Sequence, residues 1–194
     1  MPIDPEALKI PKIFYSDAKG KPFEKCIDCD RELLKNNTEY IIEKALKKYV
    51  DYDADDTIFE YAICLDCAEK LFQSFSKTSR QAIENYFEEN VDIEARLIEA
   101  GRKDNFHIND FINKCMIKGS PIENLQEYQL VCYCKGDKIS MIRPPYMVCG
   151  EASDEVMQLL SNATIDILNG FTDDFLGIPP EFRDLLKDKP ALVL

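Results

Sequence analysis

Two Cys-x-x-Cys pairs constrain this chain more than any other feature of its sequence. The first pair is Cys26 and Cys29, the second is Cys64 and Cys67, and 34 residues lie between them. A Cys-x-x-Cys turn lets both thiolates face one ion at about 2.3 Å, and two such pairs complete a closed tetrahedral zinc shell. The stretch between the pairs exceeds the ~15–20 residues of a small zinc ribbon, but a β-hairpin would fill it. We therefore predict one structural zinc ion held by Cys26, Cys29, Cys64 and Cys67.

Two other interpretations of these four cysteines stay open. Free cysteine is among the most buried residue types, so the four could be ordinary core residues. A redox dithiol is the second alternative, although such proteins usually carry a single Cys-x-x-Cys within a βαβ unit. The chain opens without a basic region followed by an apolar stretch, and no apolar run approaches the ~18 residues that span a bilayer. We expect a cytoplasmic protein, in which thiols stay reduced and paired cysteines favour metal over disulfides.

The elements predicted around the four cysteines follow a definite order. The apolar and β-branched positions of residues 39–63 favour a hairpin, and Cys64 and Cys67 lead into a predicted helix. A knuckle, a hairpin and two ligands at a helix N-terminus resemble the treble-clef class of zinc fingers, over residues 23–75. The resemblance implies a zinc-stabilised fold but no particular activity, because treble clefs occur in ribosomal, signalling, nuclease and structural proteins.

The whole chain is predicted to be α+β and to divide into three parts. Residues 1–22 form an extended arm, residues 23–105 the treble-clef-like half with its helices, and residues 106–194 a second α+β half. An acidic turn is expected at 51–56. Helices are predicted at 68–75, 76–89, 92–101, 109–118, 153–169 and 180–187, and strands at 57–63, 129–134, 139–142 and 146–149.

The second half resembles a degenerate copy of the first at an offset of 85 residues. Residues 61–64 (YAIC) match residues 146–149 (YMVC), and the apolar positions of the following helix stay in phase without a gap as far as Ser76 and Ser161. Cys67 corresponds to Ala152, so the second copy lacks a full ligand set. Two unrelated strand-to-helix units with the same periodicity are the alternative.

Four further cysteines lie outside the two pairs. Cys132 and Cys134 stand where the second copy would need its Cys-x-x-Cys. Residues i and i+2 of a strand share a face, so both thiols could turn toward Cys149, with Cys115 as a further candidate. A second metal site, a redox pair and buried core thiols are the three interpretations. We favour buried thiols and therefore one zinc ion in total.

The charge and the single histidine exclude several classes of function. The chain has 24 Lys plus Arg and 36 Asp plus Glu, a formal net charge of −12, and one histidine. A duplex nucleic-acid binder carries a basic excess, and anionic lipid also attracts basic surfaces. One histidine excludes the HExxH and three-histidine zinc sites. A zinc ion bound by four thiolates lowers the formal charge to about −14, which further disfavours nucleic acid.

We accordingly predict a non-enzymatic cytoplasmic protein in which zinc has a structural role and the acidic surface binds another protein. No direct contact with nucleic acid or membrane is expected, and a homo-oligomer is left open. One alternative is a thiol redox protein or sensor with reactive thiols and no stoichiometric metal. The other is an acidic regulator of nucleic-acid machinery that binds a basic protein rather than DNA itself.

Overall fold

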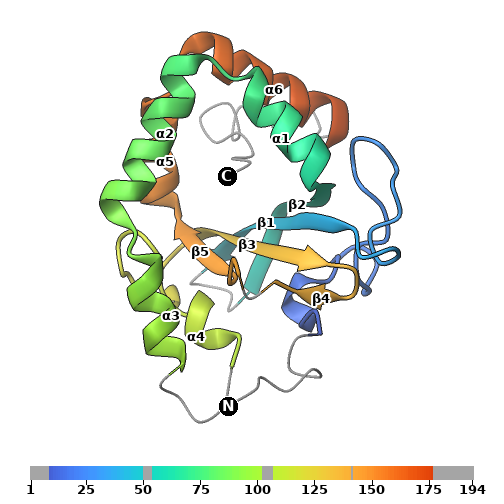
Figure 1. The fold of residues 1–194 in the computed structure, drawn as a ribbon. Coiled ribbons are helices and arrows are strands. Elements are labelled where there is room, and N and C mark those ends of the chain that lie inside the picture. Colours follow the sequence, from blue (N-terminus) through green and yellow to red (C-terminus); the bar gives the residue numbers. More distant parts are fainter. Residues whose placement is uncertain (1–8, 50–53, 102–106, 141, 177–194) are drawn as a thin grey trace.

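An antiparallel sheet built from both halves of the chain forms the middle of the molecule (Figure 1). The computed structural model describes residues 9–49, 54–101, 107–140 and 142–176. The strands follow the order β2-β1-β3-β4, and β5 pairs with β3. Their bounds are β1 Glu39–Tyr49, β2 Ala54–Cys64, β3 Glu127–Lys135, β4 Lys138–Ile139 and β5 Tyr146–Cys149. The predicted α+β class is confirmed.

The helices are α1 Leu65–Ser74, α2 Lys77–Asn90, α3 Ile93–Gly101, α4 Asn109–Ile112, α5 Gly150–Gln158 and α6 Asn162–Phe175. Helices α1, α2, α5 and α6 gather on one side of the sheet, and α3 and α4 lie at its other end (Figure 1). Two 3₁₀ turns, η2 Lys12–Phe14 and η3 Ile122–Asn124, complete the described elements. Within the described ranges, no helix has the length and apolar character that crossing a bilayer requires.

The hairpin predicted over residues 39–63 is confirmed as β1 and β2. The acidic turn is shorter than predicted, because Asp55 and Asp56 belong to β2 and lie opposite Lys48 and Lys47. Opposite charges directly across an antiparallel pair stabilise it, so the acidic residues extend the strand instead of ending it. The rest of the predicted turn lies outside the described residues.

Two predicted helices have the wrong extent. The helix predicted over 109–118 ends at Ile112, and a tight loop closed by a bridge between Lys114 and Pro121 replaces its second half. The helix predicted over 153–169 is two helices, α5 and α6. Ser161 interrupts it, because its hydroxyl accepts the backbone N–H of Thr164 as an N-cap.

The strand predicted at 139–142 is shorter than expected, since β4 comprises only Lys138–Ile139. Asp92 caps α3 as expected, its carboxylate accepting the N–H of Ala95 at 2.8 Å. The helix predicted at 180–187 lies outside the described residues.

The helical pairs of the two halves match at the predicted offset. Helix α2 spans residues 77–90 and α6 spans residues 162–175, which is a displacement of 85 residues at both ends. Their N-caps, Ser76 and Ser161, are displaced by the same number. A hydrophobic cluster between the helices draws corresponding residues from both halves: Phe75 with Leu160, and Ile83 with Leu168.

Two adjacent charged residues of β1 are buried on opposite faces of the sheet. Lys44 Nζ contacts the carboxylates of Asp17 at 2.7 Å and Glu60 at 3.4 Å, and donates to the Tyr15 carbonyl at 2.8 Å. These contacts hold residues 15–17 against the sheet. On the other face, the Tyr61 hydroxyl donates to Glu43 Oε2, and Tyr61 itself packs edge-on against Phe171 of α6.

The Glu43 carboxyl makes the stability of the fold depend on pH. Burial raises its pKa from 4.5 to about 8, against the opposing effect of the Tyr61 hydroxyl. Among the described residues, its Oε1 atom has no hydrogen-bond partner. The native state therefore keeps a proton that the unfolded chain releases above about pH 4.5, so this residue destabilises the fold increasingly up to about pH 8.

Replacing Glu43 by Gln should remove this pH dependence. Between about pH 5 and pH 8 the free energy of unfolding of the wild type should fall relative to E43Q, by up to about 1.4 kcal/mol per pH unit. Urea denaturation at several pH values measures the difference. The control is Glu39→Gln, at an exposed position of the same strand. Parallel pH profiles for the wild type and E43Q would show that Glu43 is charged in the folded protein.

Candidate metal centre

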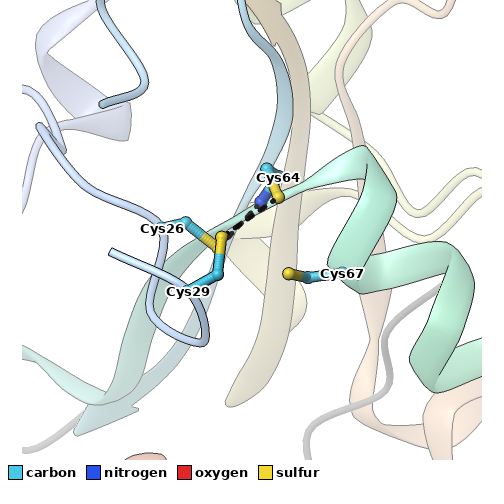
Figure 2. Close-up of side chains that lie close together, drawn as sticks. All are labelled: Cys26, Cys29, Cys64 and Cys67. Atoms are coloured by element: carbon cyan, nitrogen blue, oxygen red, sulfur yellow. Dashed lines mark hydrogen bonds between the residues drawn. The ribbon is translucent and has the colours of Figure 1, made fainter. Parts of the chain in front are cut away.

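The four cysteines of the two Cys-x-x-Cys pairs meet at one point, and their sulfur atoms all lie within 4.8 Å of one another. Cys26 and Cys29 come from the loop that precedes β1, Cys64 ends β2, and Cys67 lies in the first turn of α1. Figure 2 shows the loop sulfurs facing the two from the strand and helix. The sequence prediction that these residues converge is thus correct.

The loop that carries Cys26 and Cys29 is a tight turn held by its own backbone. A β-bridge between Lys25 and Glu32 joins the two ends of the loop. The Cys26 N–H donates to the Arg31 carbonyl at 2.9 Å, and the Asp30 N–H donates to the Cys26 carbonyl at 3.1 Å. Asp30 has a φ of 58°, a left-handed conformation that aspartate adopts more readily than most residues. The reversal brings both thiols of the pair to the same side.

The second pair lies where β2 passes directly into α1. Cys64 is the N-cap residue, with extended backbone, and Cys67 is three residues further on. The loop is fastened to this strand by the Ile27 N–H, which donates to the Ala62 carbonyl at 2.9 Å. The Cys64 N–H donates to Cys26 Sγ at 3.3 Å. Free N–H groups at a helix start stabilise thiolate charge, so the local geometry suits anionic sulfur.

The spacing of the sulfurs fits a tetrahedral metal ion. Four sulfurs at ~2.3 Å from a zinc ion lie about 3.8 Å from one another, and Cys29 Sγ lies 3.7 Å from Cys64 Sγ (Figure 2). A disulfide needs about 2.05 Å between its sulfurs, and all four residues are free thiols. The arrangement therefore has the dimensions of a four-thiolate metal site.

Burial and hydrogen bonding shift the pKa values of three of the four thiols, and not all in the same direction. Burial raises the pKa of Cys64 and of Cys67 above that of an ordinary thiol. Cys29 is exposed, and the backbone N–H of Arg31 lowers its pKa. Buried thiols that resist ionisation are poor nucleophiles. A divalent cation at their centre would reverse this preference, because a coordinated thiol is deprotonated outright.

One ion pair borders the site. Arg31 contacts Asp66 at 2.5 Å, with side chains 49% and 60% exposed. At that exposure the pair adds little stability. The Asp66 carboxylate, with the nearby Cys64 thiol, raises the pKa of Arg31. Arg31 therefore supplies a positive charge beside the thiols and links the loop to the start of α1.

The other four cysteines form two separate pairs. Cys132 and Cys134 lie on one face of β3, with their sulfurs 3.6 Å apart. Cys149 lies opposite Tyr128 at the far end of that strand, and Cys134 is six residues further along it, a distance of about 20 Å. The register thus contradicts the hypothesis that Cys132 and Cys134 gather around Cys149. Cys149 pairs with Cys115 instead, its N–H donating to Cys115 Sγ at 3.2 Å.

Sequence reasoning named Cys115 as a further candidate to lie near Cys149 but placed it in a helix. In the structure Cys115 begins a loop that is closed by a bridge between Lys114 and Pro121, as the Cys26 loop is closed between Lys25 and Glu32. The signal available was Gly119, which follows Cys115 by four residues, as Asp30 follows Cys26; both have a positive φ. Among the described residues, the four-cysteine cluster is the group of His, Cys, Asp or Glu side chains close enough to hold a metal ion.

No protein family, no curated protein and no solved structure matches this chain.

Proposed function

We propose that this chain is a non-enzymatic protein whose N-terminal half is stabilised by one zinc ion, as in treble-clef zinc fingers, and whose acidic surface binds another protein. The observation that carries the metal assignment is the convergence of four thiols within 4.8 Å. Zinc suits the site because it accepts four sulfur ligands in a tetrahedron and has no redox chemistry of its own.

The completeness of the ligand set favours a structural role over a catalytic one. A catalytic zinc ion keeps one coordination position for water or substrate, with three protein ligands. Here Cys26, Cys29, Cys64 and Cys67 supply four. An ion bound by all of them has no open position, so the proposed role is to join the loop, β2 and α1.

The charge of the chain supports a protein partner with a basic surface. The formal net charge is −12, and the zinc ion with its four thiolates makes it about −14. Helix α2 places Glu84, Glu88 and Glu89 at exposed positions. Helix α3 follows with Ile93 and Ile98, which are 54% and 49% exposed. A surface that exposes both acidic and apolar side chains suits a partner that is basic and partly apolar.

The purified protein should contain one zinc ion per chain. Cys26→Ser and Cys67→Ser should each lose the zinc ion and destabilise the protein severely, because metal binding contributes directly to folding free energy. Cys132→Ser is the matched control: it also alters a buried thiol, should keep the metal, and should cost about 1–3 kcal/mol. Native mass spectrometry and chemical unfolding measure both quantities. A metal-free protein with an oxidisable Cys-x-x-Cys pair would support the redox alternative instead.

Reversing charge on α2 should weaken the proposed interaction. Glu84 and Glu88 are one helical turn apart and both exposed. In affinity capture from an extract of the source organism, the wild type should retain a basic protein in stoichiometric amount at moderate salt and release it at high salt. The E84K/E88K variant should retain at least about tenfold less. Capture that responds neither to salt nor to this variant would contradict an acidic binding surface.

A further inference from the structure

The loop around Cys115 repeats the loop around Cys26, hydrogen bond for hydrogen bond, at an offset of 89 residues. The Cys115 N–H donates to the Ser120 carbonyl at 2.8 Å, as the Cys26 N–H donates to that of Arg31 at 2.9 Å. The Gly119 N–H donates to the Cys115 carbonyl at 2.9 Å, as the Asp30 N–H donates to the Cys26 carbonyl at 3.1 Å. Both loops are therefore built on the same turn.

Each loop is fastened to the following strand in the same way. The Met116 N–H donates to the Met147 carbonyl at 2.8 Å, and the Ile27 N–H donates to the Ala62 carbonyl at 2.9 Å. The strand-end cysteines also correspond. The Cys149 N–H donates to Cys115 Sγ at 3.2 Å. In the first unit, the Cys64 N–H donates to Cys26 Sγ at 3.3 Å.

The helices that follow are related by reciprocal hydrogen bonds. The Ser76 N–H donates to the Thr164 hydroxyl at 3.0 Å, and the Ser161 N–H donates to the Ser79 hydroxyl at 2.9 Å. Residues 76 and 79 become 161 and 164 after a displacement of 85. Each half therefore supplies the same groups to the other, as two copies related by an approximate two-fold axis would.

This correspondence assigns all four ligand positions in the second unit. Cys26 and Cys64 become Cys115 and Cys149, whereas Cys29 becomes Lys118 and Cys67 becomes Ala152. Ala152 has no exposed surface. The Lys118 ammonium contacts the carboxylate of Glu155 and lies 3.6 Å from that of Glu151, both on α5. A salt link thus joins the loop to the helix that a metal ion would otherwise connect.

We propose that Cys115 and Cys149 are the remaining half of a second four-thiolate metal site, in which the contact of Lys118 with Glu155 now performs the joining role of the ion. The Tyr86 hydroxyl of α2, which donates to Glu155 at 2.6 Å, holds this carboxylate in place from the first half. Because the turn and the N–H···S bonds are intact, cysteines at positions 118 and 152 should restore binding of a divalent metal.

The test is the K118C/A152C variant of the full chain, titrated with Zn²⁺ and with Co²⁺, whose thiolate complexes absorb in the visible. The variant should bind one metal ion more than the wild type, with Co²⁺ spectra of four-thiolate coordination. The matched control is N113C/Q158C, which adds two thiols at exposed positions on the same loop and helix and should add no ion.

The outcomes separate this inference from the proposed function. Two ions in the variant and one in the wild type support both, and one ion in each overturns the second site alone. One ion in the variant and none in the wild type supports the second site and overturns the proposed zinc role. No ion in either overturns both. If the double variant does not fold, K118C alone keeps Ala152 and offers three thiols; failure to bind one extra Co²⁺ would then overturn the proposal.

Discussion

Four thiol groups within 4.8 Å of one another cannot all ionise unless a cation lies among them. The rest of the N-terminal half depends on how this conflict is resolved, because the thiols come from a loop, a strand end and a helix start. Backbone N–H donors at Cys64 and Arg31 favour anionic sulfur, whereas burial of Cys64 and Cys67 opposes it. A divalent ion bound by the four thiols would satisfy both tendencies at once and would join the loop, β2 and α1.

The central pairing of β1 with β3 links this half to the other. Because side chains alternate along β1, Glu43 and Lys44 point to opposite faces of the sheet, and each is buried beneath the residues that cover its own face. Lys44 holds the segment before the first Cys-x-x-Cys pair through Asp17, Glu60 and Tyr15, and Glu43 with Tyr61 lies under α6. The charged Lys44 is costly to bury unless it is paired and loses much when a partner is removed, whereas the buried Glu43 carboxyl keeps its proton and accepts the hydrogen bond of Tyr61. The two layers are therefore specified by polar contacts as well as by apolar packing.

Much of the architecture was readable where a local pattern is strong. The paired cysteines predicted the convergence of Cys26, Cys29, Cys64 and Cys67, and apolar and β-branched positions predicted the hairpin over 39–63. The failures occurred where a tertiary contact overrides helical periodicity. The helix predicted over 109–118 ends early because Cys115 accepts the N–H of Lys118 within its own loop and the N–H of Cys149 from the end of β5. Gly119 was a local signal for the loop, but no local pattern reveals the contact with Cys149. The missed break at Ser161 is different, since its alignment with the capping residue Ser76 was visible in the sequence.

The two halves place different groups between the loop and the helix: four thiols in the first half, and the contact of Lys118 with Glu155 in the second. A metal ion bound by four thiolates is strong but depends on metal supply and on reduced thiols. The contact of Lys118 with Glu155 needs neither, but its side chains are 27% and 40% exposed, so its strength is modest and falls with salt. Ala152 and Val156 of the second half are fully buried, where the first half has the buried Cys67 and the half-buried Leu71. The hydrogen bond from the Ser161 hydroxyl to that of Ser76 joins the helix caps of the two halves. A copy of the first unit that lost two ligand cysteines would therefore keep its framework, because the Lys118 contact and the caps still connect its loop and helices.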